Sequence, residues 1–182
     1  MQPEISQFLS SMKKAIEQVV LANLTDRFAQ DQAGMIVGTL GFLQGVQDKA
    51  FHYELLENHL YRQLLGDLVA LVADHDAVAP IRAQLAAESA APEAHLRPYR
   101  ALRGANEMLR EQLAALIHRQ AELPTATAEA LDTRLRPFFK DLQLRERAWV
   151  RALGFDSLPD PVPDLDALLY RDGRLHLPAK EA

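Results

Sequence analysis

The chain has 182 residues, a formal net charge of −5 and no cysteine. The absence of cysteine excludes disulfides, thiolate metal sites and cysteine nucleophiles, and a chain of this length has no need of a disulfide or metal to fold. The charge is too acidic for a nucleic-acid-binding footprint. The first residues lack a secretory signal pattern and the longest uncharged run is shorter than a membrane span, so we expect a cytoplasmic protein.

Helical periodicity dominates the first 153 residues and predicts an all-α bundle of five to seven helices. Pro3 opens the first helix, whose apolar side runs from Ile5 to Val20. Thr25 or Asp26 is expected to cap a second helix over 26–47. The pattern continues over 48–73, and the sequence leaves open whether these two helices are continuous.

The segment 73–80 interrupts the pattern, and three helices are expected after it. They cover 79–90, about 98–122 and 125–153, with a kink at Pro137 in the last one. Residues 154–182 are rich in proline and aspartate. They predict an extended arm with a helical turn at 164–169 and a small hairpin turning at Asp172–Gly173. The expected division is therefore a bundle over 1–153 and an arm over 154–182.

The helix predicted over 26–47 carries four glycines at intervals of four, three and four, which places them within an arc of about 60° on a helical wheel. Apolar residues point in the other directions, so we expect this helix to be buried at the centre of the bundle. Each glycine costs about 1 kcal/mol relative to alanine in a helix interior, and some packing or binding interaction must offset that cost. Either a helix of this chain or of a second copy packs closely there, or a chain-like ligand lies on the glycines. They are Gly34, Gly38, Gly41 and Gly45.

Polar side chains continue the same stripe toward the C-terminus at helical spacing: Asp48, His52, His59 and Arg62. One interpretation is a groove along the glycines whose polar end holds the head group of a hydrophobic small molecule. The other is an ordinary solvated helix face. Together with the glycines, Asp48, His52 and His59 form the candidate ligand-binding set.

Arginines at three-residue steps begin the helix predicted over 98–122: Arg97, Arg100 and Arg103. Arginine forks match phosphate oxygens, so this run is a candidate phosphate site. The alternative is a solvated edge, or pairing with acidic residues, since residues 1–92 carry 6 basic and 11 acidic side chains. No candidate catalytic residue emerges, because the chain has neither a nucleophile elbow nor a phosphate-binding loop. No Glu-x-x-His motif predicts a metal pair, and no cofactor is expected.

The segment VLANLTDRFAQDQAGMIVGTLGFL, Val20 to Leu43, resembles the opening of small all-α proteins of unknown function. Those proteins are encoded beside acyl-CoA dehydrogenases and phosphotransferase-like kinases. The glycine helix is also similar to the small-residue helices of the acyl-CoA dehydrogenase C-terminal bundle. The resemblance implies an all-α fold and a connection with acyl or thioester metabolism, and it assigns no catalytic residue.

Two functions follow from the sequence. The first is a non-catalytic interaction or accessory protein, self-associating or part of a larger assembly, that uses the glycine face, the arm or both. The arm carries too many apolar residues to extend freely into solvent, so it wraps either its own bundle or a partner subunit. The second is a binder or enzyme for an acyl-type hydrophobic molecule in the glycine groove.

Overall fold

A computed structural model describes residues 4–73, 75–153 and 160–178. Over these residues the chain is all-α apart from one short hairpin, which confirms the predicted fold class. The chain forms two compact units, and their boundaries differ from the expected division at 153/154. Unit 1 comprises residues 1–50 with 144–165, and unit 2 comprises 51–143 with 166–182. No helix within the described ranges has both the length and the hydropathy needed to cross a membrane.

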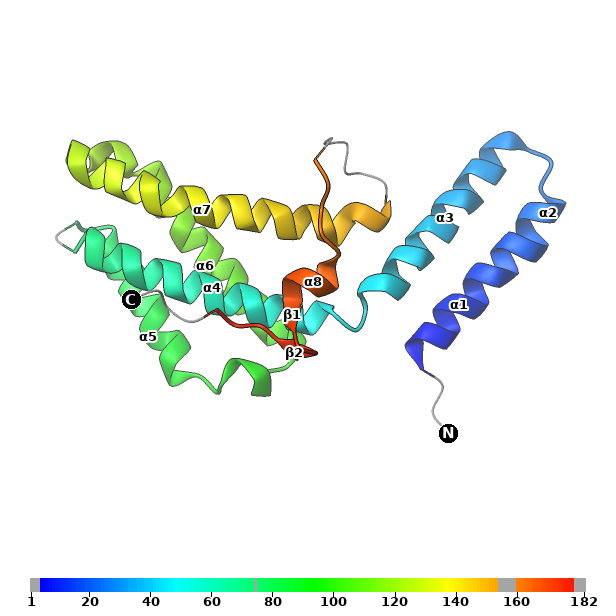
Figure 1. Cartoon of the computed structure of the whole chain (residues 1–182), viewed down its shortest axis with the longest axis horizontal. Coiled ribbons are helices and arrows are strands. Elements are labelled where there is room, and N and C mark those ends of the chain that lie inside the picture. Colours follow the sequence, from blue (N-terminus) through cyan, green and yellow to red (C-terminus); the bar gives the residue numbers. More distant parts are fainter. Residues whose placement is uncertain (1–3, 74, 154–159, 179–182) are drawn as a thin grey trace. The chain divides into compact units, whose positions relative to one another are not determined.

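Unit 1 is built on two antiparallel helices that run side by side (Figure 1). Its elements are α1 (Ile5–Ala15), the π-helical turn η1 (Ile16–Val20), α2 (Leu21–Asn23), α3 (Arg27–Val46) and the 3-10 turn η4 (Arg151–Leu153). Asp26 caps α3 as predicted, since its carboxylate accepts a hydrogen bond from the amide of Ala29 at 2.8 Å. The ring of Trp149 packs edge-on against Phe42 with centroids 6.4 Å apart. Pro3 lies outside the described residues.

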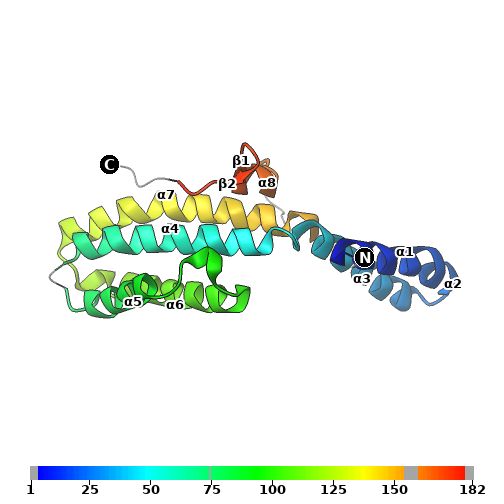
Figure 2. The ribbon, with the colours of Figure 1, turned by 90° about the horizontal axis from the view of Figure 1, so that it is seen from below.

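Unit 2 holds the main apolar core, in which α4 and α7 lie side by side (Figure 2). Its elements are α4 (Ala50–Leu71), α5 (Val78–Ala90), η2 (Ala94–Leu96), α6 (Tyr99–His118), η3 (Gln120–Glu122) and α7 (Thr125–Val150), the last of which extends into unit 1. Leu65, Leu68, Leu109 and Leu131 are completely buried and join α4, α6 and α7. Pro137 lies inside α7, so the proline does not end that helix.

The end of the described chain forms α8 (Leu165–Leu169) and the strands β1 (Tyr170–Arg171) and β2 (Arg174–Leu175). The two strands pair antiparallel, with Tyr170 opposite Leu175. Asp172 and Gly173 form the turn with φ of 51° and 71°, the left-handed pair that a tight two-residue hairpin requires. The helical turn and the hairpin predicted in this segment are both confirmed.

The burial predicted for the glycine helix is wrong for the single chain. Only Ala33 and Val46 of α3 are buried, whereas Phe28 and Met35 are 72% and 62% exposed. Among the described elements of unit 1, the helix packs chiefly on α1, η1, α2 and η4, and most of its residues stay exposed. An apolar pattern on every side indicates that a helix favours burial, but it does not show which element provides the cover. A turn at residues 47–49 separates α3 from α4, so the two helices are not continuous.

Candidate functional site

The glycine face of α3 is bare in the single chain. A Cβ atom added at Gly34, Gly38 or Gly45 would meet no heavy atom within 4 Å, and at Gly41 it would meet only the Lys13 ammonium at 3.8 Å. Within the described residues, no helix therefore makes the close approach that the sequence suggested. The glycines belong to unit 1, whereas His52 and His59 belong to unit 2.

Large exposed apolar side chains are concentrated on the α1–α3 hairpin. Fourteen large apolar side chains are exposed among the described residues, and nine of them lie between residues 5 and 43. They are Ile5, Phe8, Met12, Val19, Val20, Phe28, Met35, Ile36 and Leu43. This concentration is far above the scattered exposed apolar residues of an ordinary protein surface.

A helical wheel at about 100° per residue shows how these residues are arranged on the hairpin. In α1, Ile5, Met12 and Phe8 lie about 40°, 60° and 100° from buried Leu9, all to the same side of it. In α3, Ile36 and Leu43 lie about 60° and 80° from buried Ala33, on the side away from the glycines. Because the helices are antiparallel, both sets fall on one side of the hairpin, and the glycines fall on the other. We call Ile5, Phe8, Met12, Ile36 and Leu43 the apolar side of the hairpin.

The predicted polar row contacts the C-terminal segment of the chain rather than an open groove. The Nδ1 atom of His52 lies 2.8 Å from the hydroxyl of Tyr170, and the two rings stack edge-on. The Nε2 atom of His59 donates to the carbonyl oxygen of Pro178 at 2.7 Å. Asp48 lies in the turn after α3, exposed, 4.0 Å from the Lys49 ammonium. The two histidines thus hold the C-terminal segment against α4 within unit 2.

The three candidate phosphate arginines point to different partners. Arg97 is almost fully buried and donates to the Glu88 carboxylate at 2.7 Å and to the Pro92 carbonyl at 2.6 Å. Arg103 pairs with Glu107 one helical turn later at 3.3 Å. Arg100 is exposed. Arg97 is therefore a structural residue, and the geometry does not bring the three guanidinium groups to one site.

Sequence reasoning missed a buried polar network between α4, α5 and α6. Asn106 donates to the Glu54 carboxylate at 2.7 Å and to the Glu54 backbone carbonyl at 2.9 Å, and it accepts from Asn58 at 2.8 Å. Asn58 also reaches the Glu88 carboxylate that Arg97 neutralises. One sequence feature did mark the network, because Asn106 interrupts a heptad-like run of buried leucines: Leu102, Leu109, Leu113 and Leu116.

A second ionic pair lies beside this network. The completely buried Glu57 carboxylate is 3.5 Å from the Arg110 guanidinium, which also lies over the Tyr61 ring at 5.6 Å. Burial is the largest single influence on Arg110 and opposes its charge. The combined attraction of Tyr61, Glu57 and Glu54 outweighs burial and raises the pKa of Arg110. These polar contacts fix how α4, α5 and α6 pack.

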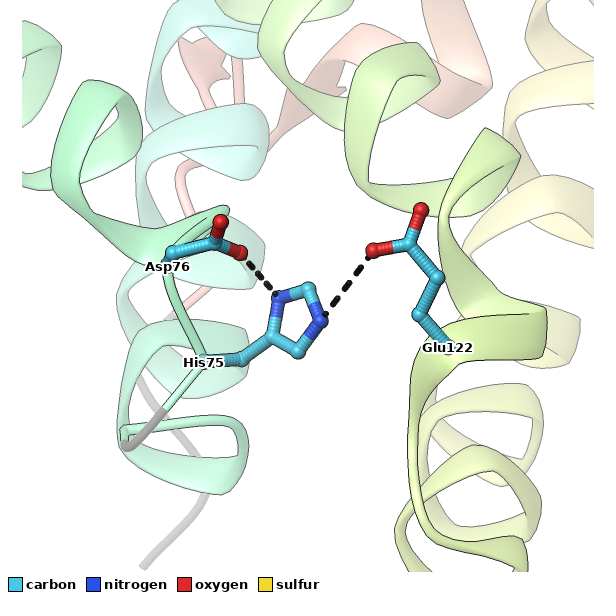
Figure 3. A group of neighbouring side chains, drawn as sticks. All are labelled: His75, Asp76 and Glu122. Atoms are coloured by element: carbon cyan, nitrogen blue, oxygen red, sulfur yellow. Dashed lines mark ion pairs between the residues drawn. The ribbon is translucent and has the colours of Figure 1, made fainter.

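A third cluster joins the α4–α5 turn to η3 (Figure 3). Figure 3 shows the His75 ring between two carboxylates, with Nδ1 3.3 Å from Asp76 and Nε2 3.6 Å from Glu122. Arg119 contacts both carboxylates at 2.6 Å. Its hydrogen bonds are the main reason that the pKa values of Asp76 and Glu122 are lowered. Asp74, the residue before His75, lies outside the described residues.

The geometry of this cluster is that of an ion-pair clasp. The two nitrogens of one imidazole face different carboxylates, so a single metal ion cannot use both nitrogens. The Nδ1 atom also accepts a hydrogen bond from the amide of Ala77 at 3.2 Å. Arg119 donates a hydrogen bond to each acid, so both carboxylates have a cationic partner without a metal ion.

Comparison of the chain with protein-family models, with curated proteins and with solved structures found no match. The resemblance of Val20–Leu43 to proteins encoded beside acyl-CoA dehydrogenases therefore stays a prediction.

Proposed function

We propose that this chain is a non-catalytic interaction protein that self-associates through the apolar side of its α1–α3 hairpin. The observation that carries the proposal is the concentration of exposed apolar side chains there, with Ile5, Phe8 and Ile36 each more than half exposed. A patch of this kind on a folded chain is typical of a protein–protein contact. Two helices alone bury too little apolar surface to be stable, so burying the exposed side of the hairpin against another surface would stabilise it.

The size of the patch fits a modest homodimer. Five side chains at about half exposure offer roughly 500 Å² per chain, or about 1,000 Å² in a dimer, just below the range of about 1,200–2,000 Å² for specific interfaces. Phe28 and Met35 lie at the edge of the patch and are the most exposed apolar residues of α3. Including them brings the buried area into that range.

The composition of the patch favours a second copy as the partner. A two-fold axis places each surface patch against itself, so a charged patch would meet its own charge. The wheel positions beside the apolar residues hold Ala15, Gln32 and Thr39, none of which is charged, and the charged neighbour Glu4 lies at the N-terminal end of α1. The centre of a self-complementary contact between two hairpins is therefore free of like charges.

The proposal is tested by sedimentation velocity and native mass spectrometry of the full chain and of variant I36E. Ile36 is half exposed, so the single chain accommodates glutamate without disturbing packing. We expect the parent chain to dimerise and I36E to be monomeric with unchanged far-ultraviolet circular dichroism. The matched control is M108E, because Met108 is equally exposed on α6 in unit 2 and should leave the dimer intact. A parent chain that stays monomeric, or an I36E variant that still dimerises, contradicts the proposal.

The second candidate function is the binding of an acyl-type hydrophobic ligand along the glycines. Native mass spectrometry of the same protein distinguishes it from self-association. It is supported by the open space beside Gly34, Gly38 and Gly45. Because the glycines face away from the apolar side, G38L should remain dimeric under the self-association proposal. A bound mass in the parent chain that is lost in G38L would instead favour the ligand.

A further inference from the structure

A groove between α4 and α5 lies within unit 2. His59, Arg62 and Gln63 of α4 line one wall, and Leu85 and Ser89 of α5 line the other. Its volume is about 400 Å³. That volume falls within the range of about 300–1,000 Å³ that is typical of small-molecule sites.

Arg62 is unusual among the arginines of the described chain. It is half-buried, yet it makes no hydrogen bond or ion pair with any residue in the described ranges. The other buried or half-buried arginines there all have partners: Arg97, Arg110, Arg119, Arg145, Arg147. A guanidinium that loses part of its hydration without gaining an acceptor is unfavourable, and an anion in the groove would supply that acceptor.

The remaining lining groups fit an anion that has a small apolar part. Gln63 offers an amide donor to an anion, whereas the Ser89 hydroxyl proton is already donated to the carbonyl of Leu85 at 2.8 Å. Leu85 adds an apolar wall. Among the described residues, no carboxylate lines the groove, and nearby Glu88 is neutralised by Arg97 at 2.7 Å.

His59 links the groove to the C-terminal segment. Its Nε2 atom donates to the Pro178 carbonyl, which can only accept, so Nε2 carries the proton. The ring is therefore held in place at the end of the groove, one helical turn before Arg62. The polar lining of the groove thus consists of the Arg62 guanidinium, the His59 imidazole, the Gln63 amide and the Ser89 hydroxyl.

We propose that the α4–α5 groove binds a small oxyanion, a carboxylate or a phosphate monoester, with Arg62 as its principal ligand. Arg62 forms a forked pair of hydrogen bonds with two oxygens of the anion, and Gln63 donates to one of these oxygens in a carboxylate or to a third one in a phosphate monoester. The organic part of the molecule lies against Leu85. This site is independent of self-association through the hairpin.

The test is a two-dimensional ¹H–¹⁵N NMR titration of the full chain with inorganic phosphate and, separately, with butyrate, at constant ionic strength. We expect saturable shifts of the Arg62 Nε–H signal and of the amides at 59–63 and 85–89. Saturation by phosphate alone assigns the site to phosphate esters, and saturation by butyrate alone assigns it to organic acids. R62Q should weaken binding of the active probe at least tenfold.

The matched control is R82Q, because Arg82 is an exposed arginine of α5 whose guanidinium, among the described residues, bonds the carbonyl of Ala73. R82Q should bind the probe as the parent chain does, and both variants should keep the parent's circular dichroism. The proposal is overturned if neither probe gives a saturable shift, or if R62Q and R82Q bind with equal affinity.

Discussion

Replacing Asn106 by alanine should destabilise unit 2 strongly, because this residue connects α6 to α4 inside the core. Asn106 is completely buried and makes three side-chain hydrogen bonds, two to Glu54 and one from Asn58. A hydrogen bond to a carboxylate contributes about 1.5–3 kcal/mol, and a neutral one about 1 kcal/mol. Including the small cavity, we expect a loss of about 3–5 kcal/mol from a stability that is typically about 5–15 kcal/mol.

The assay is urea unfolding followed by far-ultraviolet circular dichroism, with hydrogen exchange on peptides from α4 and α6 to assign the loss to unit 2. Asn23→Ala is the control, since Asn23 is exposed and bonds only the carbonyl of Val19 in its own helical segment. The double replacement of Glu54 and Asn106 by leucine removes both partners and should recover part of the loss. A loss below about 1 kcal/mol for Asn106→Ala would refute the reasoning that these hydrogen bonds are made in a dry core.

Three further predictions concern single contacts. Gly38→Ala should raise the stability of unit 1 by about 0.5–1 kcal/mol, since alanine fits the open space and favours the helical conformation. The fluorescence of Trp149, the single tryptophan, reports the unfolding of unit 1. A loss of stability would mean that the glycine face is closely covered. Arg119→Gln should lower the thermal midpoint at neutral pH, because the ionised Asp76 and Glu122 lose their hydrogen-bonded cation. The lowered pKa values of these carboxyls mean that this stability is fully present above the ordinary values of 3.8 and 4.5 and is lost as pH falls through the lowered ones. The difference between parent and variant should therefore shrink toward low pH, and a difference that persists in acid would contradict the clasp. Gly173→Ala should lower the stability of the β1–β2 hairpin by about 1 kcal/mol, because alanine is strained at φ of 71°. Hydrogen exchange at residues 170–175 should therefore accelerate. Gly66→Ala in α4 is the control and should not affect the hairpin, since a Cβ atom added at Gly66 meets no atom within 4 Å.

Much of the local structure could be predicted from the sequence, since it depends on neighbours along the chain. Asp26 caps α3 through an amide three residues later, and Asp172–Gly173 adopts the left-handed turn that these two residue types tolerate best. The apolar periodicity predicted the helices because a helix repeats its faces every three to four residues, whatever it packs against. The sequence pattern also singled out His52 and His59 as candidate ligand-binding residues. The structure shows them in contact with Tyr170 and Pro178.

The burial of particular polar residues could not be predicted in the same way. Glu54, Glu57 and Asn58 recur at helical spacing on α4, a pattern that equally describes a solvated face. They are buried because α5 and α6 bring Glu88, Asn106 and Arg110 to them from 30 or more positions away. The sequence by itself determined where helices and turns form, because hydrogen bonding and side-chain sterics within a few residues decide this. The tertiary structure alone decided which faces are covered, because burial depends on partners that are distant in sequence, and it left the α3 helix exposed where the pattern favoured burial.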